Sequence, residues 1–355
     1  MDKQKVIISA NLENALAEAV SECNPDRLFV LMDETTERLC LPVVSQFKCM
    51  ENARPIVIKA GDQHKELDAV VHVWNELQHL GATRHSLLVS LGGGMVTDLG
   101  GFAASTFKRG IQLINIPTTL LSMVDASVGG KTGFNFGGLK NEIGVFRNAS
   151  SVILDTIFLQ TMDQENLLSG YAEMLKHGLI SNEQTLTELL MFDIEQPNLQ
   201  QLQQMVAESV QVKQRIVQED PTEQGIRKAL NLGHTIGHAF EALSLSHNAH
   251  RFVPVLHGYA VAWGLVCELY LSTVKTGFPV DRMRQTVRFI FEHYGRMAIT
   301  CDDYPTLLEL MTHDKKNIAG QINFTLLGGV GDILINQTAT KSEIEEALDF
   351  YREGQ

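Results

Sequence analysis

Short apolar runs alternate with amphipathic stretches along the first half of the chain. Runs of the length of buried parallel strands occur at 28–32, 55–59, 87–91, 111–116 and 152–154. Between the second and third runs, Leu67, Val70, Trp74 and Leu77 recur at helical spacing, which predicts a helix that ends near residue 80. This order predicts a mostly parallel sheet with helices on both faces.

From about residue 163 the pattern becomes helical. Helices are predicted at 164–179, 199–218, 257–273 and 341–351, with one strand at 322–327. No later region repeats the succession of strand, glycine turn and helix. We therefore predict an α/β domain over residues 1–162 and an all-α domain over residues 163–355.

Composition and charge narrow the class of protein. The 355 residues are 44% hydrophobic and 20% charged, as in an ordinary globular protein. The net charge of −13 argues against nucleic acid as the main partner, and it suits an anionic small substrate only where Lys and Arg gather locally.

Localisation is predicted from three further features. The five scattered cysteines indicate reduced thiols, not a disulfide framework. The first twenty residues lack the apolar core of a signal peptide. The most apolar helix candidate, 261–274, is too short for a membrane span and is interrupted by Glu268. We expect a cytoplasmic protein that does not contact a membrane.

A glycine turn follows the strand at 87–91. Gly92, Gly93 and Gly94 lead into a helix from Met95, and an exposed helix N-terminus can bind a phosphate group. The spacing is not GxGxxG, so a purely structural turn remains an alternative. Together with the strand order, the turn predicts a Rossmann-like domain.

Two acids near these strand ends have two interpretations each. Asp33 follows the first strand and can bind a ribose hydroxyl or cap the next helix; the residues alone favour the cap. Asp98 lies in the first helical turn after the glycines, where it can compensate the helix dipole or contact a cofactor.

Residues 118–144 are rich in polar side chains. Thr118 and Thr119 follow the strand at 111–116, and six glycines lie between residues 129 and 144 together with Lys131, Lys140 and Asn141. Residues 130–132 read Gly-Lys-Thr, but the upstream P-loop glycine is replaced by Asp125, which excludes a nucleoside triphosphatase. The stretch favours an anionic ligand over a solvated surface loop.

A second informative stretch is RKALNLGHTIGH at 227–238. His234 and His238 are four residues apart on one helical face, and Asn231 is expected on the same side. This spacing indicates either a zinc site or an incidental pair, and His257 is a third candidate ligand. His247 and His250 lie in a polar loop and are expected to be exposed.

Charged residues elsewhere have ordinary explanations when taken alone. Glu173 and Lys176 are three apart on one helix face, a spacing that usually gives a surface ion pair. The run 313–317 precedes a strand and is typical of a turn, although a lysine there can reach back to an anion.

With these pieces in order, the chain resembles the 3-dehydroquinate synthases along nearly its whole length. The motifs are GGGMVTDLGGFAA, KRG, IPTTLLSMVDASVGGKTG, LKNEIGVF, AEMLKHGLI, RKALNLGHTIGHAFEA, HGYAVAWG and DKKN. The resemblance implies a two-domain dehydroquinate synthase-like fold, a homodimer, catalytic NAD and a divalent metal, Zn²⁺ or Co²⁺. It also implies a cleft between the domains where the nicotinamide ring meets the metal.

The resemblance implies site residues position by position. The metal ligands are Glu173, His234 and His257. His238 is an acid/base group beside the metal, so local spacing alone would have paired the wrong histidine with His234. The other catalytic residues are Glu223 as proton acceptor, Lys176, Lys131 and Asn141. The substrate contacts are Arg109 from the neighbouring subunit, Asp125, Lys131, Asn141, Lys176, Lys213, Arg227, Asn231 and one of Lys315 or Lys316, with Lys316 favoured.

For NAD the matching positions are Asp33, Asp62, Lys65, Gly93, Gly94, Met95, Asp98, Thr118, Thr119, Lys131, Lys140, Phe158 and Thr161. Two positions depart from the family pattern. Asp62 stands where Glu is frequent, and Tyr259 follows the His-Gly pair where Glu is common. The first departure bears on the contacts to the adenosine side of NAD.

The implied reaction converts 3-deoxy-D-arabino-heptulosonate 7-phosphate to 3-dehydroquinate and phosphate, in the route to aromatic amino acids. NAD takes a hydride and later returns it, so no net NADH appears. Three alternatives remain: another sugar-phosphate cyclase, a metal- and NAD-dependent polyol dehydrogenase, and a binding protein without activity. A dehydrogenase would release NADH with its product, and a binding protein would leave the lysines and metal-type ligands without a purpose.

Overall fold

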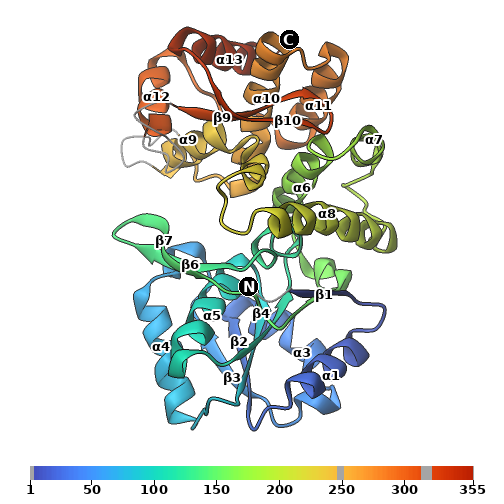
Figure 1. Cartoon of the computed structure of the whole chain (residues 1–355), viewed down its shortest axis with the longest axis vertical. Coiled ribbons are helices and arrows are strands. Elements are labelled where there is room, and N and C mark those ends of the chain that lie inside the picture. Colours follow the sequence, from blue (N-terminus) through green and yellow to red (C-terminus); the bar gives the residue numbers. More distant parts are fainter. Residues whose placement is uncertain (1–3, 246–251, 313–321, 355) are drawn as a thin grey trace. The chain divides into compact units, whose positions relative to one another are not determined.

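The computed structural model describes residues 4–245, 252–312 and 322–354 (Figure 1). The chain divides into two compact units. The first comprises residues 1–163 and 198–210, and the second comprises residues 164–197 and 211–355. Helix α8 (Leu199–Glu219) begins in the first unit and ends in the second, whereas the sequence predicted a single division after residue 162.

A six-stranded parallel sheet forms the centre of the first unit. Its strand order is β1-β8-β5-β4-β2-β3, and every pairing is parallel. The strands are β1 (Lys5–Ile8), β2 (Leu28–Asp33), β3 (Arg54–Ile58), β4 (Leu87–Gly92), β5 (Gln112–Pro117) and β8 (Ser151–Leu154). All five strands predicted for the first half of the chain are confirmed within one residue at each end. The sequence did not predict β1, a four-residue edge strand with exposed ends.

Helices and short turns connect these strands. They are α1 (Leu12–Cys23), α2 (Glu34–Leu39), α3 (Leu41–Val44), η1 (Lys48–Met50), η2 (Asp62–His64), α4 (Leu67–His79), α5 (Gly94–Thr106), η3 (Phe107–Arg109), η4 (Ser122–Ala126) and η5 (Thr156–Thr161). Val70, Val73 and Leu77 are fully buried on one face of α4. Of the other residues of the predicted apolar face, Trp74 is half-buried and Leu67, at the first position of the helix, is exposed.

An antiparallel hairpin that the residue pattern did not predict lies in the glycine-rich stretch 129–144. Strands β6 (Lys131–Phe136) and β7 (Leu139–Phe146) pair in antiparallel register and turn at Gly137 and Gly138. Ile143 O lies so close to Gly133 that a Cβ there would collide with it. The glycines therefore serve strand pairing as well as any ligand.

The second unit is helical, as predicted, and it also contains a hairpin whose first strand was predicted at 322–327. Its helices and turns are α6 (Gln164–Leu179), α7 (Glu183–Met191), η6 (Ile226–Asn231), α9 (His234–Leu245), α10 (His257–Thr276), α11 (Val280–Tyr294), η7 (Cys301–Asp303), α12 (Tyr304–Thr312) and α13 (Lys341–Glu353). Strands β9 (Asn323–Gly329) and β10 (Asp332–Thr338) form an antiparallel pair, so the unit is not purely α. Among the described helices, none has both the length and the apolar character needed to span a bilayer.

Candidate active site

Close packing of α6, α9 and α10 brings three predicted metal ligands together. A Cβ on Gly264 of α10 would collide with Gly233 O at the start of α9, and one on Gly258 would collide with Ser169 O of α6. Glycine at these positions lets the helices approach at backbone distance. As a result, Glu173 from α6, His234 from α9 and His257 from α10 converge.

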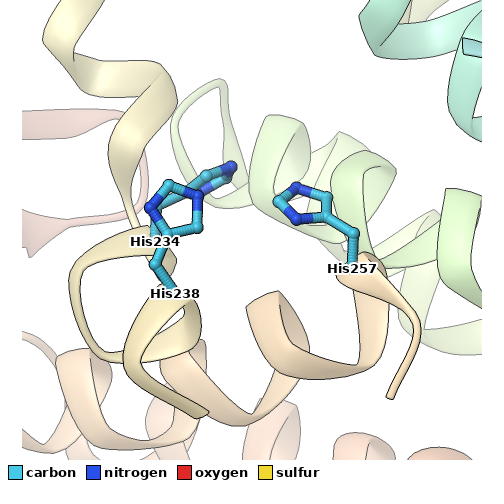
Figure 2. A group of neighbouring side chains, drawn as sticks. All are labelled: His234, His238 and His257. Carbon is cyan, nitrogen blue, oxygen red and sulfur yellow. The ribbon is translucent and has the colours of Figure 1, made fainter. Parts of the chain in front are cut away.

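The donor atoms of these residues meet at one point. His234 Nε2 lies 3.4 Å from Glu173 Oε1, and His257 Nε2 lies 3.7 Å from the same oxygen. His238 is close as well, since one ligand atom from each of the three histidines lies within 4.8 Å of the others. Figure 2 shows the three rings gathered near the N-terminal ends of α9 and α10.

This donor set fits a divalent cation. In tetrahedral coordination with Zn–N and Zn–O bonds of about 2.0–2.2 Å, neighbouring ligand atoms lie roughly 3.3–3.6 Å apart. The two separations at Glu173 Oε1 are close to that range. Within the described part of the chain, this buried oxygen has no hydrogen-bond partner. Two imidazoles and one carboxylate are the ligands of a catalytic zinc site.

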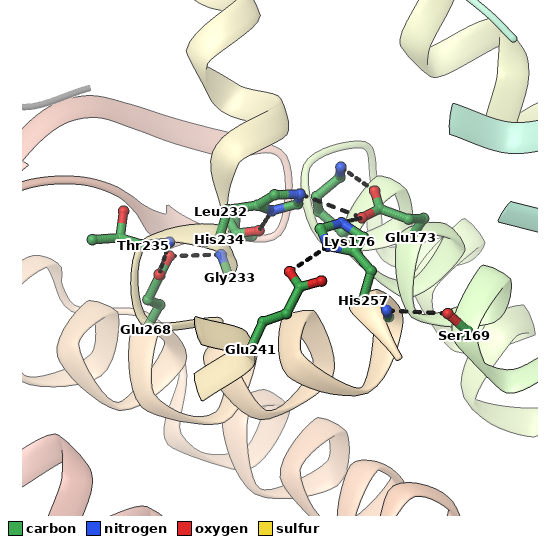
Figure 3. Close-up of polar contacts among 11 residues, drawn as sticks. Ser169, Glu173, Lys176, Leu232, Gly233, His234, Thr235, Glu241, His257 and Glu268 are labelled. Atoms are coloured by element: carbon green, nitrogen blue, oxygen red, sulfur yellow. Dashed lines mark hydrogen bonds and ion pairs between the residues drawn. The ribbon is translucent and has the colours of Figure 1, made fainter. Parts of the chain in front are cut away.

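Two further contacts orient the imidazole rings (Figure 3). His257 Nδ1 lies 3.2 Å from Glu241 Oε2, and His234 Nδ1 lies 3.0 Å from Leu232 O. Both acceptors are oxygens, so each Nδ1 carries the proton and each Nε2 is directed to Glu173. Sequence reasoning missed Glu241 because it lies sixteen residues before His257, and the two side chains meet only in the folded unit.

The ionisable side chains of this cluster lie close enough to shift one another's pKa values. Glu173 and Lys176 form an ion pair with both side chains buried, not the surface pair that the spacing suggested. Burial alone would raise the pKa of Glu173, but the positive charge of Lys176 and contacts with His234 hold it well below its usual value. Burial, with the charge of Lys176, lowers the pKa of His234 to about 3. The imidazole of His234 is therefore neutral and able to bind a metal ion.

His257 has the opposite electrostatic environment. Burial would lower its pKa, but interactions with the carboxylates of Glu173 and Glu241 raise it to about 10. In the metal-free chain these two carboxylates therefore hold a protonated imidazole between them. A metal ion that binds here must displace this proton.

A tight loop before α9 carries two other predicted residues. Asp220 accepts backbone hydrogen bonds from Gln224 at 3.0 Å, Gly225 at 2.6 Å and Arg227 at 3.1 Å. Within this loop Glu223 has a φ of 62°, and its Oε1 accepts a hydrogen bond from Asn231 Nδ2 at 2.8 Å. Asp220 was absent from the predicted site residues, although the Asp220–Pro221 pair favours the start of a turn.

The helix register expected for Asn231 is wrong. Asn231 ends η6, and the chain breaks at Leu232 and Gly233 before α9 begins at His234. A single helix would have placed Asn231 and His234 on one face. The structure instead brings Asn231 to Glu223.

The glycine turn has the expected form. Gly93 caps α5, and a Cβ there would lie 3.1 Å from the Thr119 side chain; a Cβ on Gly94 would lie 3.1 Å from Ala126. Glycine at these two positions therefore lets Thr119 and Ala126 pack closely against the start of α5. Asp33 accepts hydrogen bonds from the backbone of Thr35 and Thr36, so the capping interpretation is confirmed.

Lys65 is the buried centre of a polar network in the first unit. Its Nζ lies 2.5 Å from Asp98 Oδ2 and 2.6 Å from Asn141 Oδ1, and the side chain is 3% exposed. Asn141 N in turn donates to Asn135 Oδ1 at 2.9 Å. The network joins α5 to the β6–β7 hairpin, a connection that the sequence did not reveal.

The remaining predicted residues are placed as follows. In the first unit, Arg109 ends η3 with a φ of 67°, Asp125 lies in η4, Met95 lies in α5 and Lys131 opens β6. Thr118 is buried after β5, Lys140 Nζ lies 3.5 Å from Asp62, and Phe158 and Thr161 lie in η5. In the second unit, Lys213 is buried in α8 and Arg227 is buried with Nη1 donating to Pro221 O at 2.6 Å. Lys315, Lys316, His247 and His250 lie outside the described residues.

Comparison with known proteins identifies the family of this chain. The family model described as the N-terminal part of 3-dehydroquinate synthase matches residues 55–169, and the C-terminal model matches residues 170–317. The chain belongs to the 3-dehydroquinate synthase family. The resemblance drawn from the sequence motifs is thereby confirmed.

Relatives within the 3-dehydroquinate synthase family match over nearly the full length. The chain is 54% identical over 354 residues to a 3-dehydroquinate synthase from Parabacteroides distasonis, covering 100% of this chain and 99% of the relative. It is 36% identical to one from Pyrococcus furiosus, covering 94% and 96% of the two chains.

Solved structures support the fold alone. A 2-deoxy-scyllo-inosose synthase complexed with carbaglucose-6-phosphate, NAD⁺ and Co²⁺ matches with a TM-score of 0.84 at 23% identity, over 99% of this chain and 96% of that one. A 2-epi-5-epi-valiolone synthase from Streptomyces hygroscopicus with NAD⁺ and Zn²⁺ matches with a TM-score of 0.83 at 24% identity, over 100% and 98%. A probable glycerol dehydrogenase from Sinorhizobium meliloti has a TM-score of only 0.61 at 16% identity, over 99% and 96%.

Proposed function

We propose that this chain converts 3-deoxy-D-arabino-heptulosonate 7-phosphate to 3-dehydroquinate and inorganic phosphate. Membership of the 3-dehydroquinate synthase family supports the activity, and so does the 54% identity to a named family member over the full length. The structural observation that best supports the activity is the convergence of Glu173, His234 and His257 beside the buried Lys176.

The proposal includes a divalent cation, Zn²⁺ or Co²⁺, and NAD. Glu173, His234 and His257 would hold the cation, and the glycine turn from Gly93 with the network of Lys65 would receive NAD. When bound, the cation lowers the pKa of a substrate hydroxyl and NAD accepts and returns a hydride. Two solved cyclases of the same fold carry NAD⁺ with Co²⁺ or Zn²⁺, which supports this choice.

The chain's own side chains would supply charge and proton transfer. Lys176 places a positive charge beside Glu173, where a hydroxyl that loses a proton is stabilised. His238 lies within reach of the ligand atoms without being one of the three proposed ligands, which suits an acid/base group. Glu223, hydrogen-bonded to Asn231, is the proposed proton acceptor of the loop before α9.

The anionic substrate would be bound mainly by basic and amide side chains, with one acidic side chain, Asp125, among them. The proposed contacts are Asp125, Lys131, Asn141, Lys176, Lys213, Arg227, Asn231 and Lys316. Phosphate and carboxylate groups pair with Lys and Arg, and local clustering of these side chains offsets the net charge of −13. Arg227 and Lys213 are buried, as expected for side chains that hold a desolvated anion.

The proposal extends to assembly and location. We place Arg109, which has a left-handed backbone conformation, against the substrate of a second subunit in a homodimer. Cytoplasmic location is supported by five cysteines whose thiols are free.

One assay tests the activity. Phosphate release from 3-deoxy-D-arabino-heptulosonate 7-phosphate should be catalytic, should cease with a chelator, should return when Zn²⁺ or Co²⁺ is added, and should proceed without net NADH. Cyclisation of sedoheptulose 7-phosphate in place of the keto-acid phosphate would assign the chain to another cyclase. NADH in proportion to product would assign it to the polyol dehydrogenases.

A further inference from the structure

Glu268 lies in the middle of α10 and is completely buried, yet no motif pointed to it. Its two carboxylate oxygens accept three backbone hydrogen bonds from the start of α9. Oε2 accepts from Gly233 N at 2.6 Å, and Oε1 accepts from Thr235 N at 3.0 Å and Ile236 N at 3.2 Å. A helix begins with N–H groups that have no partner within the helix, and here a distant carboxylate supplies the partners (Figure 3).

The local sequence explains why the cap comes from another helix. Gly233 precedes α9 with a φ of 79°, and a Cβ there would press on Leu265 and Val261 O. Glycine is therefore required, and glycine has no side chain that can cap the helix. The buried negative charge of Glu268 is balanced by three N–H donors and by the positive end of the helix dipole.

One of these bonds reaches the proposed metal site through a single peptide unit. The N–H of Gly233 and the carbonyl of Leu232 belong to the same planar peptide group. The N–H donates to Glu268 Oε2, and the carbonyl accepts from His234 Nδ1 at 3.0 Å. The orientation of this peptide plane therefore determines where the imidazole of His234 points.

We infer that Glu268 is a positioning residue that acts through the Leu232–Gly233 peptide to hold His234 with its Nδ1 protonated and its Nε2 toward Glu173. Hydrogen bonds in a chain polarise one another, so the carboxylate also makes the Leu232 carbonyl a better acceptor for Nδ1–H. The imidazole then becomes a better ligand at Nε2, the effect that a direct carboxylate partner has on a metal-bound histidine. His257 has such a direct partner in Glu241, whereas His234 obtains the same effect through a peptide bond.

Helix α10 thus contributes twice to the cluster. It carries His257 at its first residue, and it fixes the start of α9 through Glu268 three turns later. The distance between His234 and His257 therefore depends on this one helix. This inference rests on the proposed metal centre for its consequence, but the orientation of His234 is testable without metal.

The experiment uses the full chain with Glu268→Gln, which keeps the shape and removes the charge. A glutamine offers one acceptor oxygen, and its NH₂ group would face an N–H donor. Cobalt(II) affinity is measured by chelator competition, and the ¹⁵N and ¹H shifts of the His234 ring are recorded in the metal-free chain. We expect roughly 10–100-fold weaker cobalt binding, the range found for outer partners of metal ligands. We also expect loss of the single Nδ1-protonated signal of His234.

Thr340→Ala is the matched control. Thr340 caps α13 in the same unit with its own side chain, away from the cluster, so its loss destabilises the chain without touching His234. The urea midpoint of each variant shows whether the two are comparably destabilised. If Glu268→Gln does not fold, Glu268→Asp is judged by the same criteria, because it keeps the charge but shortens the reach.

A His234 ring spectrum in the Glu268 variant identical to that of the unmodified chain overturns the inference. The same holds for unchanged cobalt affinity in a chain that binds cobalt before substitution. Failure of the unmodified chain to bind cobalt contradicts the proposed metal centre instead, and the ring spectrum then still decides the role of Glu268.

Discussion

Glu173 and Lys176 lie one turn apart on α6, and their ion pair is buried, with 0% and 1% of the side chains exposed. A buried carboxylate that loses its partner keeps the cost of desolvation without the compensating charge. The pair is therefore the most sensitive electrostatic element of the cluster. Its disruption should affect stability as well as turnover.

We expect Lys176→Met to abolish turnover and to lower the free energy of unfolding of the metal-free chain by about 3–5 kcal/mol. Added Zn²⁺ should restore part of the stability, because the cation replaces the lost positive charge beside Glu173. Urea denaturation with and without Zn²⁺ measures both effects. Lys275→Met is the control, since Lys275 pairs with Glu343 in a half-exposed position and its removal should cost less than about 1 kcal/mol. Equal losses in the two variants would contradict the argument.

His257→Ala should yield a folded chain without metal. Of the three proposed ligands, His257 is the one that brings its own carboxylate partner, Glu241, to the cluster. Two remaining ligands do not make a stable zinc site. Metal analysis after gel filtration checks this. The control is His293→Ala, since His293 lies on α11 and its ring is near Glu195. A full equivalent of zinc in the His257 variant would show that this residue is not a ligand.

The fold was predictable because its signals are local. The strand at 87–91 is apolar except for Ser90 and α6 has a clear helical period, and both were located within one residue. β1 has only four residues, and the β6–β7 hairpin is rich in glycine, so neither carries a pattern that a window of residues can register. The break at Gly233 was missed because Leu232 continues the helical period across it.

The site was less accessible to sequence reasoning because it depends on packing between distant helices. His234 and His238 are neighbours in any helix, whereas Glu241 meets His257 and Glu268 meets Gly233 only when α9 packs on α10. Only the family resemblance supplied Glu173. No periodicity reports that an acid one turn from a lysine is buried instead of exposed.

Lys65→Met should weaken NAD⁺ binding by at least tenfold. Lys65 is the buried cation that holds Asp98 of α5 and Asn141 of β7 in place, and without it each of these side chains loses one hydrogen bond. Fluorescence titration with NAD⁺ measures the affinity. Lys140→Met tests the alternative that any lysine near the β6–β7 hairpin suffices. Lys140 lies on β7, its side chain is half-exposed, and its Nζ lies 3.5 Å from Asp62. A larger effect at Lys140 than at Lys65 would reverse this ranking.

Asp220 links pH to the loop that carries Glu223 and Arg227. Burial would raise its pKa, but the three backbone donors from Gln224, Gly225 and Arg227 lower it below the ordinary value of 3.8. A carboxyl with a lowered folded pKa contributes stability that is fully present above the unfolded pKa. That contribution is lost as the pH falls through the folded pKa.

We therefore expect Asp220→Asn to lower the urea midpoint at pH 7 and to flatten the loss of stability as the pH falls below about 4. The amide keeps the bond to Gln224 but turns a donor toward Gly225 or Arg227, so turnover should fall and KM should rise as the loop loosens. Asp193→Asn is the matched control. Asp193 accepts backbone bonds from the two residues 195 and 196 in a similar turn that carries none of the proposed site residues. If the two variants lost turnover equally, the Asp220 loop would have no special part in substrate binding.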